Sequence, residues 1–185
     1  MLLNNFKKAH RWAIFNYPKK RCVIIKKIRE KAKFNSFMII EINQSNKIEQ
    51  TNKDSIVGLA NEKTFTVLIK SKIKRKLQEE FRKQNKPRLF VYRTFVASVV
   101  LLLKYARLKN ISKIIIDEEY YGKDKMLKSM FLETWSRFFK EIPEVSFEKI
   151  GRKSKAHSVC YLTMKGKHKP NKVIEFEEIK KLALK

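Results

Sequence analysis

The stretch from Phe90 to Ala106 constrains the fold most, because its apolar side chains nearly surround the helix that it would form. Its most apolar part, Thr94 to Leu103, is ten residues long and lies between Arg93 and Lys104. A membrane-spanning helix needs ~20 apolar residues, so this part is too short to cross a bilayer. Pro87 suits the first turn of such a helix. The pattern predicts a helix buried against a sheet, and no membrane partner.

Apolar segments on both sides of this helix supply the strands of that sheet. Before it, three segments separated by short turns predict an antiparallel meander. After it, a short apolar run that ends in Asp117 is typical of a parallel strand, and another strand follows the next helix. A right-handed crossover is expected between these two strands. The predicted strands are 37–42, 55–60, 64–69, 113–117 and 145–150, and helices are expected over about 71–83, 87–106, 124–142, 154–164 and 177–184. An apolar stripe from Met126 to Ile142 indicates the third of these helices, and Ser154 is the expected N-cap of the fourth.

The chain divides at about residue 34 into a basic segment and a larger α/β domain. Residues 1–33 contain eleven Lys or Arg and a single acid, Glu30, and part of this segment fits a basic amphipathic helix. We therefore expect a basic helical N-terminal segment over 1–34, which is either a solvated helix or a binding arm. Residues 35–185 form the predicted domain.

The compartment is predicted from the cysteines and the N-terminus. Cys22 and Cys160 lie far apart and form no CxxC pair, so we expect neither a disulfide partner nor a zinc knuckle. No signal-peptide core follows Met1. Both observations favour a cytoplasmic protein.

The charge of the chain indicates its partner. The 185 residues include 44 Lys or Arg and 18 Asp or Glu, which gives a formal net charge of +26. Self-repulsion of this size opposes folding, and a polyanion relieves it through counterion release. Nucleic acid, either RNA or DNA, is the first candidate. The sequence carries no RNA-recognition aromatic motif, KH glycine loop, zinc finger or P-loop.

Two segments concentrate the basic residues. Residues 70–93 hold ten Lys or Arg beside Glu79 and Glu80, and residues 149–172 hold eight and no acid. A solvated helix face is the alternative interpretation of each segment. The predicted nucleic-acid contacts are Lys72, Lys74, Arg75, Lys76, Lys149, Arg152, Lys153 and Lys155.

The predicted element order over residues 36–165 resembles the ribonuclease H-like superfamily, which includes RNases H, four-way-junction resolvases and DDE transposases. The resemblance implies a mixed five-stranded sheet, with three antiparallel strands followed by a parallel βαβ step, flanked by helices. It also rests on the placement of acids: Glu41 on the first strand and Asp117 at the end of the fourth.

The resemblance implies a phosphodiester-cleaving site at these acids. In the superfamily, acids on these strands and on the last helix hold two metal ions, which stabilise the attacking and leaving oxygens. By this resemblance Glu41, Asp117 and Glu118 would bind Mg²⁺ or Mn²⁺, with Glu119 as the alternative to Glu118, and His157 would assist as a proton shuttle. A divalent-metal-dependent nuclease is the resulting hypothesis.

Two departures keep other functions open. Asn43 lies two residues after Glu41, on the same strand face, and a carboxamide there would remove charge that the metals need. In the resolvase branch an acid follows the last helix's His by three residues, whereas Cys160 follows His157 here. The alternatives are a catalytically inactive module of the same fold that binds RNA or DNA, and a different α/β fold that docks on structured RNA.

Overall fold

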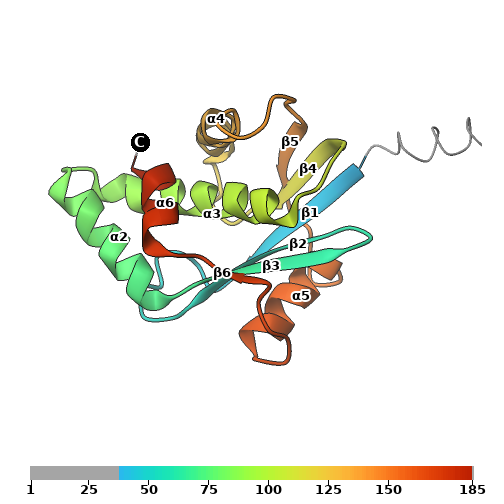
Figure 1. Ribbon diagram of the computed structural model, residues 1–185, viewed down its shortest axis with the longest axis horizontal. Coiled ribbons are helices and arrows are strands. Elements are labelled where there is room, and N and C mark those ends of the chain that lie inside the picture. The colour runs from blue at the N-terminus through green and yellow to red at the C-terminus, as the bar shows by residue number, and fades with distance from the viewer. Residues whose placement is uncertain (1–37, 185) are drawn as a thin grey trace, which may run out of the picture. The chain divides into compact units, whose positions relative to one another are not determined.

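A computed structural model describes residues 38–184, and these residues form one compact α/β unit with a six-stranded mixed sheet (Figure 1). The basic helical segment predicted over 1–34 lies outside the described residues. The strands are β1 (Met38–Ser45), β2 (Ser55–Ala60), β3 (Thr64–Ile69), β4 (Ile111–Asp117), β5 (Glu144–Glu148) and β6 (Lys172–Val173). The helices are α2 (Ser71–Lys83), the 3₁₀ turn η1 (Pro87–Leu89), α3 (Phe90–Ala106), α4 (Asp124–Trp135), α5 (Lys155–Met164) and α6 (Phe176–Ala183).

The strands lie in the order β5-β4-β1-β2-β3-β6. β1, β2 and β3 pair antiparallel, which confirms the predicted meander. β4 pairs parallel with both β1 and β5, as the pattern of short apolar runs predicted. The prediction of five strands is wrong by one, because Lys172 and Val173 pair with Val67 and Leu68 of β3. A two-residue strand is too short to show a period in the sequence.

The two faces of the sheet are covered by different helices (Figure 1). α3 packs on one face of the sheet, and α4, α6 and α2 pack against α3. α5 packs on the other face, against β1, β2 and β3. Side chains alternate along β1, so Ile40 and Ile42 enter the core beneath α3. Glu41 and Asn43 lie on the opposite face of the strand, toward α5.

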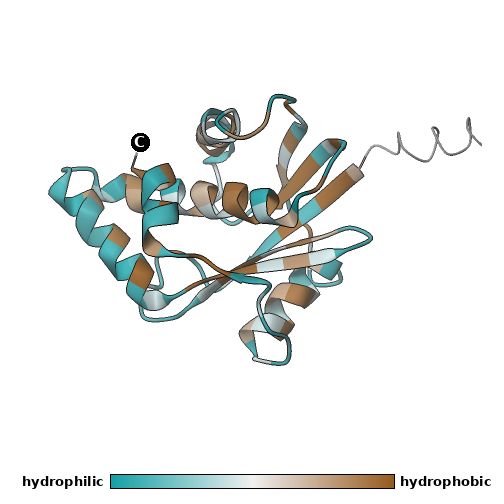
Figure 2. Ribbon diagram, viewed as in Figure 1, coloured by the Kyte–Doolittle hydropathy of each residue, from teal (hydrophilic) through white to brown (hydrophobic). Residues whose placement is uncertain are grey.

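α3 is the central helix of the core, as its apolar pattern predicted. Eleven of its residues are buried, and Figure 2 shows hydrophobic residues along most of it. The stretch Pro87–Ala106 is long and apolar enough to pass for a membrane span by length and composition. Its packing against the sheet, α4 and α6 accounts for this apolar character, since each buried Leu, Val or Phe side chain stabilises a fold by roughly 1.5–3 kcal/mol.

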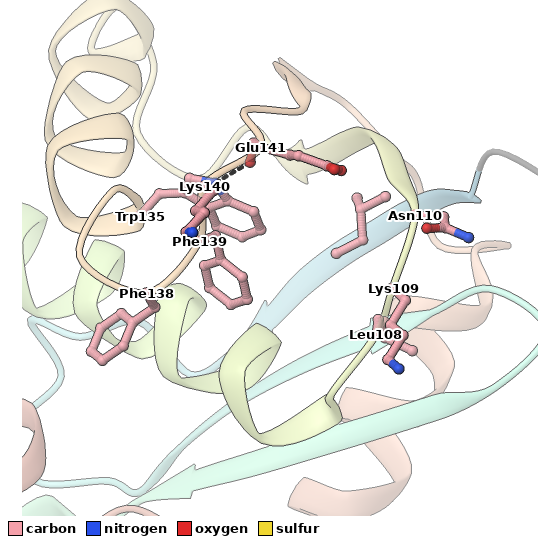
Figure 3. A pocket seen from close by; sticks show the side chains of 9 residues that line it. Leu108, Lys109, Asn110, Trp135, Phe138, Phe139, Lys140 and Glu141 are labelled. Atoms are coloured by element: carbon pink, nitrogen blue, oxygen red, sulfur yellow. Dashed lines mark hydrogen bonds between the residues drawn. The ribbon is translucent and has the colours of Figure 1, made fainter.

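α4 ends at Trp135, seven residues before the end that the apolar stripe predicted. The Trp135 indole donates to the Glu141 carbonyl at 2.8 Å, and Phe139 stacks on Trp135 although the chain between them has left the helix. This turn and the start of β4 line an open pocket of about 360 Å³ with both aromatic and charged side chains (Figure 3). The pocket lies at Ile111, the opposite end of β4 from Asp117, so it is not part of the site described next.

Candidate functional site at the carboxyl ends of β1 and β4

The carboxyl ends of the parallel strands β1 and β4 lie side by side. Ile42 pairs with Ile116, so the next residues along each strand, Asn43 and Asp117, face each other on the α5 side of the sheet. Ligands of open α/β sheets bind at the carboxyl ends of parallel strands. The loops after β1, β4 and β5 therefore surround the candidate site.

Asn43 and Asp117 form a direct amide–carboxylate pair. The Asn43 Nδ2 donates to Asp117 Oδ2 at 2.7 Å, and the backbone N–H of Ile150 donates to Asp117 Oδ1 at 3.0 Å. A carboxylate only accepts hydrogen bonds, so it orients the amide with Nδ2 toward itself and leaves the buried Asn43 Oδ1 without a partner among the described residues. Both Asp117 oxygens are thus satisfied by protein donors.

α5 approaches the sheet closely beside this pair. The Cys160 thiol donates to the Asn43 carbonyl at 3.1 Å, and Gly58 is the cross-strand partner of Asn43 on β2. A Cβ atom on Gly58 would lie 2.6 Å from Cys160 Sγ, so glycine is what permits this approach. Burial raises the pKa of the Cys160 thiol far above its usual range, and the nearby carboxylates of Glu119 and Asp117 add to the shift. Cys160 is therefore a packed, protonated thiol.

The Glu41 carboxylate is hydrogen-bonded to Ser154, the residue immediately before α5. Ser154 is the N-cap of this helix, as predicted, and its Oγ accepts from the Ala156 N–H at 3.0 Å. The same hydroxyl donates to Glu41 Oε2 at 2.7 Å. Glu41, Ser154, Lys153 and Lys155 line an open hollow of about 460 Å³. The carboxylate therefore lies next to basic side chains and the N-terminus of a helix.

Glu119 is the most perturbed acid at this edge. Its side chain is 13% exposed, and Lys47 reaches its Oε2 at 3.8 Å and its carbonyl at 3.1 Å. Burial raises the Glu119 pKa to about 7, and repulsion from the Asp117 carboxylate adds to the shift. Glu119 thus changes charge near neutral pH, directly beside the Asn43–Asp117 pair.

The other two predicted catalytic residues, Glu118 and His157, have different surroundings. Glu118 extends the β4–β5 pairing, because its N–H donates to the Glu148 carbonyl at 3.1 Å. His157 lines a different hollow from Glu41, together with Arg152 and Tyr161. The roles predicted for Glu41, Asp117, Glu118 and His157 in catalysis stay predictions from the sequence.

The side chains at this edge do not fit a pair of Mg²⁺ or Mn²⁺ ions. Within residues 38–184 no three His, Cys, Asp or Glu side chains lie close enough to hold a metal ion together. One Glu41 oxygen accepts from Ser154, and both Asp117 oxygens accept from N–H groups. Hard cations bind to oxygen atoms. Beside the Glu41 and Asp117 carboxylates, the positions where a cation would lie are taken by N–H and O–H groups that donate hydrogen bonds.

The predicted nucleic-acid contacts fall into two groups, one on α2 and one between β5 and α5. The prediction for one residue, Lys74, is wrong. Lys72, Arg75 and Lys76 are exposed on α2, but the prediction for Lys74 is wrong because its side chain is fully buried. The Lys74 ammonium donates to the Lys47 and Gln50 carbonyls and to Ser55 Oγ, and burial lowers its pKa to about 8. It holds the β1–β2 loop and is not accessible to phosphate.

The second group forms one exposed segment at the carboxyl edge. We call residues 149–155 the basic loop; it connects β5 to the first residue of α5. The Asp117–Ile150 hydrogen bond anchors this loop to the end of β4. Its exposed basic residues are Lys149, Arg152, Lys153 and Lys155.

The sequence interpretation missed three features of the site. Glu119 was predicted only as the alternative to Glu118, and the burial that raises its pKa was not predicted. Ser154 was predicted as a cap, but its bond to Glu41 joins elements 113 residues apart. Tyr161 carries no local signal beyond its position four residues after His157. No protein-family model, curated protein or solved structure matches the chain.

Proposed function

We propose that the protein binds nucleic acid through the basic loop, on a ribonuclease H-like domain that does not use a metal pair. The observation that carries the proposal is the position of this loop. It is exposed, it contains no acid, and it lies at the carboxyl ends of parallel strands. At this edge the Lys and Arg side chains of the basic loop bind the phosphates of the nucleic acid.

The sheet supports the proposed fold. Its central order, β3-β2-β1-β4-β5, with β2 antiparallel and β4 and β5 parallel to β1, is the arrangement that the resemblance implies. β6 is an addition next to β3 and leaves this order unchanged. α5 then takes the position of the superfamily's last helix, with its N-terminus beside Glu41.

Electrostatics favour phosphate at the basic loop. Lys149, Arg152 and Lys153 precede the N-terminus of α5, where unpaired N–H groups and the helix dipole also attract anions. No acid occurs from Lys149 to Ile174, so nothing within this part of the sequence opposes a polyanion. With a net charge of +26 on the whole chain, a nucleic acid would also relieve self-repulsion.

The Asn43–Asp117 pair supports binding without metal-dependent cleavage. Two carboxylates at this separation would repel each other and need a cation between them. An amide opposite Asp117 satisfies one oxygen, and Ile150 satisfies the other. Asp117 then acts as a positioning residue that holds the basic loop.

The test compares binding and cleavage of labelled single-stranded, duplex and branched oligonucleotides in Mg²⁺, Mn²⁺ or EDTA. We expect binding in all three conditions, no cleavage, and affinity within about twofold for Asp117→Asn, since the isosteric amide still accepts from Ile150. Asp117→Ala, which removes the acceptor, is expected to weaken binding. Metal-dependent cleavage that Asp117→Asn abolishes would overturn the proposal in favour of a nuclease.

A further inference from the structure

A second hollow lies along the outer side of α5. It has a volume of about 500 Å³ and is lined by Arg152, His157, Ser158, Tyr161 and Leu162. Tyr161 is 46% exposed, one of only a few large hydrophobic side chains that the described residues leave open to solvent. The hollow thus combines an aromatic ring with groups that donate hydrogen bonds and a guanidinium.

The helix explains why these residues share one side. His157 and Tyr161 are four residues apart, as are Ser158 and Leu162, so the two pairs form adjacent rows on the helix surface. The buried side of the same helix, formed by Ala156, Cys160 and Thr163, packs on the sheet. Arg152 enters from the basic loop, and the Lys165 ammonium lies 5.6 Å from the centre of the Tyr161 ring.

We propose that this hollow binds an unpaired base of single-stranded nucleic acid, an inference that rests on the proposed function. Tyr161 stacks on the base, His157 and Ser158 lie within reach of its polar edge, and Arg152 and Lys165 bind the flanking phosphates. The basic residues would attract any polyanion, but the Tyr161 ring favours a nucleic acid over an acid-rich protein, because every base offers a planar face on which the ring can stack.

The geometry selects single strands over duplexes. In a duplex both faces of a base are covered by its neighbours, so Tyr161 cannot stack on it without unstacking the duplex. An unpaired base exposes its face. Its backbone phosphates then lie near the basic loop on one side and Lys165 on the other, both of which belong to the acid-free segment.

The experiment measures the affinity of the full chain for a labelled uridine 12-mer, a thymidine 12-mer and a blunt duplex of equal length. Tyr161→Ala is expected to weaken binding of both single strands about 5- to 150-fold, the range for loss of one stacked base. It should change duplex affinity less than about twofold, because phosphate contacts remain. Tyr161→Phe, which keeps the ring, should bind like wild type. Tighter binding of the uridine strand than of the thymidine strand by the wild-type chain identifies RNA as the preferred ligand.

Tyr121→Ala is the matched control, since Tyr121 is 86% exposed and lies in the loop after β4, outside this hollow. It should bind both kinds of nucleic acid like wild type. The inference is overturned if Tyr161→Ala binds single strands like wild type, or loses single strands and duplex equally, while the proposed function stands. A wild-type chain that binds neither overturns both.

Discussion

Replacing Gly58 by Ala tests the close approach of α5 to the sheet, on which the site depends. The new methyl group would lie 2.6 Å from Cys160 Sγ and 3.1 Å from Thr66 Cγ2, distances that force α5 or β3 to move. Overpacking of a core typically costs about 1–3 kcal/mol, and the restricted unfolded chain returns about 0.4–1 kcal/mol. We expect Gly58→Ala to lower the free energy of unfolding by about 1–2 kcal/mol, measured by urea denaturation followed by circular dichroism.

A double-mutant cycle with Cys160→Ala identifies the cause. If the sulfur atom is the obstacle, its removal makes room for the methyl group, and Gly58→Ala becomes nearly neutral in that background. The expected coupling is about 1–2 kcal/mol, above the roughly 0.3–0.5 kcal/mol within which independent sites add. Equal costs of Gly58→Ala in both backgrounds would refute the reasoning, because α5 would then not contact β2 at this position.

Two further predictions concern Glu119 and Lys74, two charged residues whose side chains are largely or fully buried. Because Glu119 has a folded-state pKa of about 7 and an ordinary unfolded value of 4.5, its ionisation destabilises the fold as pH rises through this window, by up to about 3 kcal/mol at 1.36 kcal/mol per unit. Glu119→Gln should remove this loss. The urea midpoints of variant and wild type should therefore agree at pH 4, and the variant's midpoint should be higher at pH 8. An equal difference between the midpoints at both pH values would contradict the raised pKa of Glu119. Lys74→Ala should lower the free energy of unfolding by at least about 2 kcal/mol, because it deletes a buried stem and leaves loop carbonyls unpaired, yet leave nucleic-acid affinity within about twofold. A loss of affinity at unchanged stability would show that Lys74 contacts the ligand.

The sheet was predictable because its strands differ locally from their surroundings. Alternation and short turns predicted β1 to β3, and the acid after an apolar run predicted β4 as a parallel strand. Helix α5 was found through its cap, Ser154. The end of α4 was not found, because Phe139 keeps the helical spacing from Trp135 while packing through a turn.

The site was less predictable because it depends on long-range register. Whether Glu41 or Asn43 faces Asp117 is decided by the pairing of Ile42 with Ile116, which no local pattern contains. The burial of Lys74 did have a signal: it lies three residues before Leu77 and seven before Phe81, on the apolar stripe of α2. Its charge concealed that signal within a Lys-rich segment.

The most direct test of the account is the salt dependence of nucleic-acid binding with the basic loop neutralised. Each cation that contacts phosphate contributes about 0.7 to the log–log slope on single strands, so replacing all four by Gln should reduce the slope by up to about 2.8. A control that removes the same charge elsewhere should leave the slope nearly unchanged. The test variant replaces Lys149, Arg152, Lys153 and Lys155, and the control replaces the exposed Lys86, Lys109, Lys125 and Lys128.

Fluorescence anisotropy of a labelled single strand in EDTA, between about 50 and 200 mM salt, provides this slope. We expect a steep slope for wild type and for the control, and a shallow one for the basic-loop variant. Equal slopes for the two variants would contradict this expectation, because binding would then follow net charge alone and not contacts at the carboxyl edge of the sheet.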